Sequence, residues 1–284
     1  MRILYGSGNF IGSNIAAGRF VLNAPGHDIQ VAAHYRNHRY LKHIHWCLDA
    51  LYTTKVGDKN YFKENYGRPG PYINHALADL IINDLLEWQP ELVISDCEYF
   101  TAMVAKAFGI PLWYCSPLLQ ITGIVHEKGE ISSKRFNQLK WYLESLPDGD
   151  NYLIYSPLGD IKNRPLLKPG FQWIRPYSSM PKEITSEDVD LSLIQKLLPG
   201  KSNICTGEMS FISDCLYTGK PLYISPNPLE LEQVMNAQLL EWYGVAKNIG
   251  RPQSLDFAKR QVERPNPVPI LSIQNWKQLD EQLE

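Results

Sequence analysis

Long apolar runs are missing from this sequence, and so are the cysteine spacings of metal sites. No stretch approaches the ~18 apolar residues that a membrane-spanning helix needs, so we expect no span. The 284-residue chain has five cysteines, none of them spaced as C-x-x-C, so nothing indicates a zinc or redox site. Reduced cysteines are typical of cytosolic proteins. We therefore expect a cytoplasmic protein that binds no metal and needs no cofactor.

Charge of one sign is not in excess over the whole chain, because the formal net charge is −2 at pH 7. The segment 33–68 departs from this balance, with seven Lys and Arg against three Asp and Glu, and with four His. Basic side chains interleaved with aromatic ones suit phosphate contacts and base stacking. A solvated helix face is the alternative explanation. The candidate nucleic-acid contacts are Arg36, Arg39, Lys42, Lys55 and Lys59.

Short apolar segments alternate with helical patterns along the first part of the chain. In one of them, Ile73, Leu77 and Leu80 recur about one turn apart, which predicts a helix. The order strand, helix, strand implies a parallel sheet that is covered on both faces. We expect strands at 2–5, 29–33, 91–95, 111–115, 152–155 and 171–174, and helices from about Ser13 and over 72–88, 99–108 and 132–146.

A second alternation of strands and helices follows a polar segment, 178–199, where we place a domain boundary. Its expected strands are 202–205 and 221–224, its helices are 210–217 and 230–242, and a last helix is expected over 273–283. The sequence thus predicts an α/β protein of two Rossmann-like parallel-sheet domains facing a cleft. These are residues 1–177 and a reduced second domain, residues 178–284.

Ligands in open parallel sheets bind outside the carboxyl ends of the strands. Four loops that follow expected strands carry glycine or polar residues there, although strand ends also need turns for purely structural reasons. These loops are 6–12, 95–98, 206–210 and 225–228.

The segment that begins with the loop 206–210 has the chemistry of a nucleotide-sugar site. Gly207 lets backbone amides approach a diphosphate with no side chain in the way. Ser210 and the amides of the following helix can donate to phosphate oxygens. Asp214 can accept the ribose hydroxyls, and residues of the next helix can bind sugar hydroxyls. The candidate donor-binding residues are Gly207, Glu208, Ser210, Asp214, Glu232 and Gln233.

This segment resembles the donor-binding half of the UDP-glycosyltransferase and MurG-like superfamily, which has the GT-B fold. The matching residues are Gly207, Ser210, Asp214, Gly219-Lys-Pro221, Glu232-Gln233 and Asn236-Ala237, with Asp214 where the family usually has a ribose-binding Glu. The resemblance implies an inverting glycosyltransferase with a nucleotide-sugar donor, which we expect to be a UDP-sugar. It also implies an acceptor-side loop in the first domain, with Gly8, Asn9, Gly12 and Ser13.

Two departures from the family bear on activity. Many relatives carry a His after the last glycine of the first loop as the catalytic base, and Ser13 stands there in this chain. The second domain is also shorter than in those relatives, and the missing part precedes Cys205. A non-catalytic nucleotide-sugar-binding protein is therefore the alternative to an enzyme.

Transfer to a hydroxyl needs a side chain that accepts its proton. Asp96 and Glu98 emerge from one strand end and are the first candidates, with His34 at the end of the second strand as a reserve. The alternative for Asp96 is structural, as the N-cap of the helix that begins at Tyr99.

The basic segment and the compact chain resemble phage enzymes that glycosylate hydroxymethylated cytosine in duplex DNA. This resemblance indicates which acceptor to expect. Such an enzyme flips the target base into its site. Duplex DNA is thus the specific expectation for the acceptor. A hydroxyl of a small molecule or of a lipid is the alternative.

Overall fold

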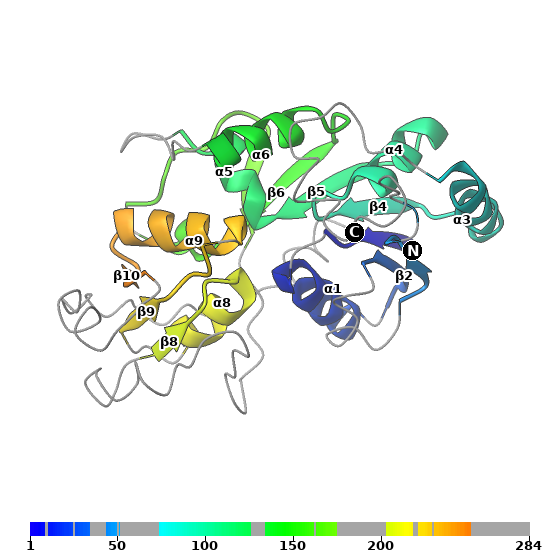
Figure 1. Ribbon diagram of the computed structural model, residues 1–284. Helices are drawn as coiled ribbons and strands as arrows, with labels where there is room; N and C mark the ends of the chain where they lie inside the picture. Colours follow the sequence, from blue (N-terminus) through cyan, green and yellow to red (C-terminus); the bar gives the residue numbers. More distant parts are fainter. Residues whose placement is uncertain are drawn as a thin grey trace. The chain divides into compact units, whose positions relative to one another are not determined.

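The computed structural model of the chain is drawn in Figure 1. It describes residues 1–8, 11–24, 26–34, 44–49, 51, 74–125, 134–161, 163–174, 203–217, 221–228 and 230–250. The described residues belong to two compact units.

The first unit is built on a seven-stranded sheet with the order β3-β2-β1-β4-β5-β6-β7. The neighbouring pairs from β3 to β6 are all parallel. Strand numbers rise in both directions from β1, as in doubly wound α/β folds. The strands are β1 (Arg2–Gly6), β2 (Asp28–Ala33), β3 (Trp46–Cys47), β4 (Leu92–Ser95), β5 (Leu112–Ser116), β6 (Asn151–Tyr155) and β7 (Phe171–Ile174).

Helices cover both faces of this sheet. Right-handed crossovers place a helix between β1 and β2 on one face and the helices before and after β4 on the other, and Figure 1 shows α1 and α4 on opposite sides of the strands. The helices are α1 (Ile11–Asn23), α3 (His75–Trp88), α4 (Tyr99–Phe108), α5 (Gln120–Gly123) and α6 (Lys134–Glu144), with 3₁₀ turns η2 (Pro117–Leu119) and η3 (Pro157–Asp160).

The core of the first unit lies along its central strands. Ile3 and Leu4 of β1 and Val93 and Ile94 of β4 are completely buried. Strands that are covered on both faces need continuous apolar runs, which explains why the sequence predicts β1 and β4 well. β3 was not predicted, because it has only two residues and lies inside the basic segment.

The second unit carries a smaller parallel sheet with the order β10-β9-β8. Its strands are β8 (Asn203–Cys205), β9 (Leu222–Ile224) and β10 (Lys247–Asn248), and its helices are α8 (Met209–Tyr217) and α9 (Leu231–Trp242). Ile212 of α8 and Met235, Leu239 and Leu240 of α9 are buried. The α/β class, the parallel pairing and the smaller second sheet are confirmed.

Some expectations fall outside the described residues. These are the boundary between residues 177 and 178 and the last helix, 273–283. The chain also passes between the units more than once, since residues 155–166 and the end of β7, from Trp173, group with the second unit. Among the described helices, none combines the length and apolar character needed to cross a membrane.

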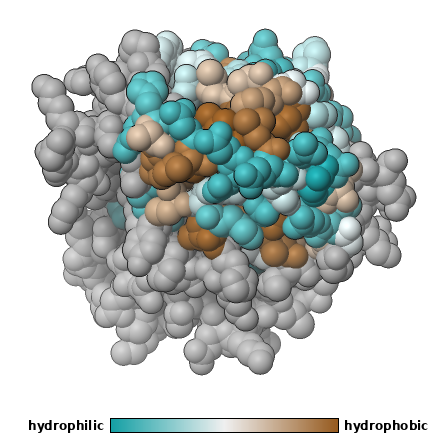
Figure 2. Space-filling model, turned by 90° about the vertical axis from the view of Figure 1, so that its right-hand side faces the viewer, coloured by the Kyte–Doolittle hydropathy of each residue, from teal (hydrophilic) through white to brown (hydrophobic). Residues whose placement is uncertain are grey.

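One face of the first unit exposes apolar side chains. Figure 2 shows this side of the molecule, where brown surface lies among hydrophilic residues. The large exposed apolar side chains of α3 and α4 are Leu80, Leu86, Met103 and Phe108, with 63%, 48%, 40% and 43% of their surface accessible.

Candidate functional site

The carboxyl ends of the first sheet gather polar residues from five neighbouring strands. Because β2, β1, β4, β5 and β6 run parallel, the residues at their ends share one edge of the sheet. The backbone N–H of Asp96 donates to the Gly6 carbonyl at 2.8 Å, which fixes Asp96 directly beside the end of β1. The polar residues of this edge are Ser7, His34, Asp96, Ser116 and Ser156.

Asp96 is a buried carboxylate at this edge, with 1% of its surface exposed. Neither of its oxygens has a hydrogen-bond partner of regular geometry among the described residues. Burial raises its pKa to about 6, because a carboxylate loses its hydration there, and the hydroxyls of Ser116 and Ser13, which face it, offset part of the rise. Asp96 therefore ionises closer to neutral pH than an exposed aspartate does.

Glu98 has a different environment, although it lies only two residues further on. Its Oε1 accepts the Phe100 amide at 3.0 Å, and its Oε2 accepts the Thr101 amide at 2.7 Å and the Thr101 hydroxyl at 2.8 Å. Glu98 is thus the N-cap of α4, and the alternative that gave this cap to Asp96 is wrong. Burial still raises the pKa of Glu98, since these donors offset only part of the desolvation.

His34 follows β2 and is 1% exposed. Its Nδ1 lies 3.0 Å from Oδ1 of Asp49, which comes from the end of β3. A proton on Nδ1 can be donated to this carboxylate, and the contact orients the imidazole ring. His34 also lies close enough to Glu98 that a positive charge on its ring lowers the pKa of that carboxyl.

Ser116 is a site residue that the sequence did not single out. Its Oγ accepts the Leu118 amide at 3.2 Å, and Ser156 accepts the Leu158 amide in the same way at 3.3 Å. Both serines begin a Ser-Pro-Leu run at the end of a strand. The repeated run after two apolar segments was the available signal.

In the second unit, Gly207 follows β8 in a conformation that requires glycine. Its φ is 111°, and a Cβ there would lie 2.9 Å from the Gln233 carbonyl oxygen and 3.1 Å from Cγ2 of Ile224. The Asn236 side chain donates to the Gly207 carbonyl at 2.9 Å. The loop after β8 is therefore packed directly against the first turns of α9.

Glu208 and Gln233 continue this contact through their side chains. Gln233 Nε2 donates to Glu208 Oε1 at 2.7 Å, and Gln233 Oε1 accepts the Asn227 amide at 2.8 Å. The Thr206 hydroxyl donates to the other Glu208 oxygen. These bonds join the loops that follow β8 and β9 into one hydrogen-bonded group.

Glu232 reaches the beginning of α8, where its Oε1 accepts the Met209 amide at 3.3 Å. Its exposed fraction is 2%, and Ser210, in the first turn of α8, is completely buried. The resemblance assigned Glu232 and Gln233 to the sugar. Both side chains bond to the protein itself, and their sugar contacts stay a prediction.

The other predicted residues of the described ranges lie in the first loop, in α1 and in α8. Gly8 follows β1, and Gly12 and Ser13 lie in the first turn of α1. Asp214 belongs to α8, but its side chain is not among those described. Within the described ranges, no three His, Cys, Asp or Glu side chains gather as a metal site would require. The predicted residues outside the described ranges are Asn9, Arg36, Arg39, Lys42, Lys55 and Lys59.

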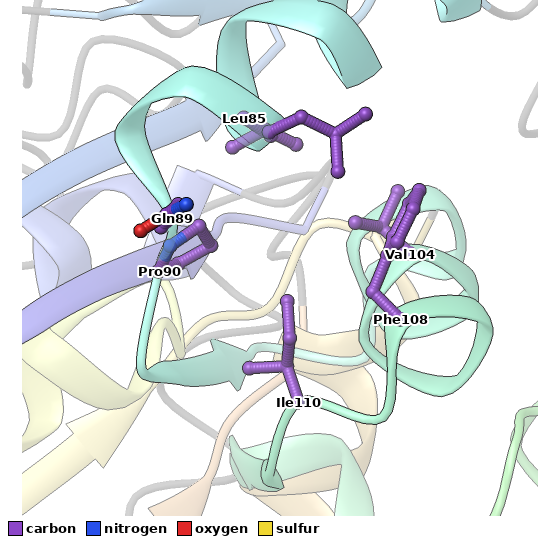
Figure 3. Close-up of a pocket in the computed structure, with 7 residues that line it drawn as sticks. Leu85, Gln89, Pro90, Val104, Phe108 and Ile110 are labelled. Atoms are coloured by element: carbon purple, nitrogen blue, oxygen red, sulfur yellow. The ribbon is translucent and has the colours of Figure 1, made fainter.

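A small cavity lies away from this edge, between the ends of α3 and α4. Figure 3 shows Leu85, Val104, Phe108 and Ile110 turned toward one another, with Gln89 and Pro90 on one side. These segments precede β4 and β5 in the chain. The cavity is therefore at the amino edge of the sheet, opposite Asp96.

No protein-family model matches the chain, and neither does any curated protein. Solved structures do resemble it. They include the Streptomyces sp. SF2575 glycosyltransferase SsfS6 (19% identity, TM-score 0.52) and the spinosyn rhamnosyltransferase SpnG with thymidine diphosphate (12%, TM-score 0.57); each match covers 92% of this chain and 90% of the other. The spinosyn forosaminyltransferase SpnP matches at 15% identity and a TM-score of 0.52, over 92% of this chain and 89% of its own. The chain thus has the fold of the GT-B glycosyltransferases.

Proposed function

We propose that this protein transfers a sugar from a nucleotide-sugar to a hydroxyl group of a small molecule. The observation that carries the proposal is the glycine turn at Gly207, which joins the carboxyl end of β8 to the start of α8 in a GT-B fold. Structures with this fold, SsfS6 and SpnG, have been solved with thymidine diphosphate. We place the donor site at this loop, where Gly207 has no side chain beside the start of α8.

The donor side of the proposal follows from the loops after β8 and β9. The amides at the start of α8 point along the helix axis, where a negatively charged phosphate is favoured. Ser210 and Asp214, of the same helix, are the proposed phosphate and ribose contacts. The nucleotide is a uridine or thymidine diphosphate, and the sequence resemblance favours the former.

A small-molecule hydroxyl is a better acceptor for this proposal than duplex DNA. SpnG has been solved with the spinosyn aglycone, a small acceptor, and that structure matches this chain with a TM-score of 0.52. The basic residues that favoured DNA lie outside the described residues. Nothing in the described structure adds support for a DNA acceptor.

Donor binding is tested by thermal unfolding with UDP, TDP and their glucose conjugates. A ligand at about 100 times its Kd stabilises the folded protein by about 2.7 kcal/mol, which for a chain of this size raises the Tm by several degrees. No shift with any of the four compounds would overturn the proposed donor site.

Acceptor class is tested by mass spectrometry of products from the nucleotide-sugar that binds. Phenols, aliphatic alcohols and a lipid alcohol are compared with duplex DNA that contains 5-hydroxymethylcytosine. We expect a hexose added to a small hydroxyl compound. Transfer to the DNA alone would restore the sequence-based expectation, and binding without any transfer would favour the non-catalytic alternative.

A further inference from the structure

We propose that Asp96 itself accepts the proton of the acceptor hydroxyl, with no histidine between its carboxylate and the substrate. The proposal rests on the proposed sugar transfer and names the group that performs its proton step. It follows from what the neighbouring polar side chains at the carboxyl edge of the first sheet already bind.

The other two candidate bases are held by local structure. Both carboxylate oxygens of Glu98 accept hydrogen bonds from Phe100 and Thr101 at the start of α4, with three donors within 3.0 Å. A Glu98 that took a proton from substrate would lose part of this cap. His34 is oriented by Asp49 at the end of β3, two strands away from Asp96 in the sheet order β2-β1-β4.

Asp96 differs from Glu98, because neither oxygen of this buried carboxylate has a hydrogen-bond partner of regular geometry in the described structure. Burying an unpaired carboxylate costs folding free energy, and unsatisfied buried groups are rare enough in folded proteins to need a specific cause. A functional carboxylate is such a cause, since a group that must take up a proton cannot be saturated by strong donors.

Two hydroxyls orient Asp96 without saturating it. Ser116 accepts the Leu118 amide through its oxygen, so its own proton is directed elsewhere and can face Asp96. Ser13 faces Asp96 from the first turn of α1. Ser13 and Ser116 are thus positioning residues. Ser13 stands where the sequence resemblance would place a histidine, and a serine hydroxyl cannot relay the proton as a neutral imidazole does.

The proton step then balances with the groups already named. The acceptor oxygen forms a bond to the anomeric carbon, while the bond from that carbon to the diphosphate oxygen breaks and its electron pair leaves with the nucleoside diphosphate. The hydroxyl proton passes to the Asp96 carboxylate, which later releases it to solvent. Burial also keeps bulk water away from the carboxylate, which limits hydrolysis of the donor.

The hydroxyls and thiols that surround Asp96 are uncharged near neutral pH. The groups that face it are the hydroxyls of Ser13 and Ser116 and the thiols of Cys97 and Cys115. Burial raises the pKa of both thiols well above its usual range, so both stay uncharged around neutral pH. Neither thiol is therefore expected to contribute an ionisation to the acid limb of activity.

The test compares full-length wild-type protein with Asp96→Asn, using UDP-glucose or TDP-glucose, whichever the wild type turns over. Asp96→Asn keeps the side-chain shape and is expected to lower kcat by ~10²–10⁴-fold while the Kd for the nucleotide changes less than about twofold. Asp84→Asn is the matched control, since Asp84 lies on α3, away from this edge, and accepts from Nε1 of Trp46. It should leave kcat near that of the wild type.

The pH profile separates a base from a structural residue. In the wild type, log kcat/KM should rise with a slope of one up to about pH 6 and then level off. Ser116→Ala removes a donor to the carboxylate, which raises the Asp96 pKa further and moves this limb to higher pH. A merely structural Ser116 would change the Tm and leave the limb in place.

Three results would overturn the proposal while leaving the donor site intact. They are an Asp96→Asn protein that transfers sugar within a few fold of the wild type, an Asp96→Asn protein that loses nucleotide binding together with activity, and a limb that disappears in His34→Asn but not in Asp96→Asn. A wild-type protein that neither binds nor transfers would instead overturn the proposed function itself.

Discussion

The amide of Met209 at the start of α8 donates to the Glu232 carboxylate at 3.3 Å, so a side chain of α9 occupies the end of α8 that the proposed function assigns to donor phosphate. Two negative groups at one helix terminus repel each other. Glu232→Gln keeps the shape of the side chain and removes its charge. We expect the Kd for UDP or TDP to fall by ~2–5-fold, measured by calorimetry, because charge effects at a helix terminus are worth ~0.3–1 kcal/mol.

The control for this change is on the same helix. Glu241, near the end of α9, pairs with Lys247 at 3.2 Å, and Glu241→Gln should leave the Kd unaltered. A sugar contact predicts a different result, in which Glu232→Gln weakens binding of the nucleotide-sugar and leaves binding of the bare nucleotide unchanged. That outcome would support the role assigned by resemblance and contradict competition with phosphate.

The contrast between Asp96 and Glu98 shows how far sequence reasoning reaches. Apolar runs such as those of β1 and β4 locate strand ends, and with them the loop that holds both carboxylates. The roles of the two residues depend on backbone torsions, since Cys97 between them has a φ of 53°. This turn directs Glu98 to the helix amides and leaves Asp96 beside β1. No spacing rule encodes it.

Side-chain direction also limited the prediction for α9. Glu232 and Gln233 open this helix as the resemblance requires, but adjacent helical residues point in different directions, and the sequence cannot say which direction meets protein. Ser116 was missed for a related reason. Its role depends on β5 lying beside β4, a long-range pairing that local patterns do not contain.

Gly207 should tolerate no side chain. Gly207→Ala places a Cβ within 2.9 Å of the Gln233 carbonyl oxygen, in a backbone region that L-residues avoid. Strain of this kind costs ~1–3 kcal/mol before the clash is added, so the midpoint of urea unfolding for the second unit should fall clearly and nucleotide binding should be lost.

A substitution at Gly170 separates the backbone strain from the steric clash. It also has a positive φ, 85°, but a Cβ there meets nothing within 4 Å. Gly170→Ala should lower the free energy of unfolding only by the backbone strain, ~1–2 kcal/mol. Equal effects at Gly207 and Gly170 would mean that the close approach of α9 contributes nothing.

The cap of α4 gives a prediction about stability alone. Glu98→Ala leaves the amides of Phe100 and Thr101 without their acceptor in a buried place. Loss of an N-cap costs ~0.5–2 kcal/mol, and we expect the upper end of this range in urea denaturation. Glu91→Ala, which removes an exposed acidic side chain paired with Arg2, should cost less than about 1 kcal/mol. A smaller loss at Glu98 than at Glu91 would contradict the capping role.

The raised pKa of Asp96 makes folding stability depend on pH. In the folded protein its pKa is about 6, against 3.8 for an exposed carboxyl. The folded state thus holds this proton more tightly, so the associated stability is fully present below about pH 4 and is lost as the pH rises through about 6. The difference corresponds to about 3 kcal/mol.

Asp96→Asn removes the group, so at pH 8 the variant should unfold at a higher urea concentration than the wild type, and near pH 4 the two unfolding midpoints should converge. Parallel curves for the two proteins across this range would show that Asp96 has an ordinary pKa, and the acid limb expected for its activity would lose its physical basis.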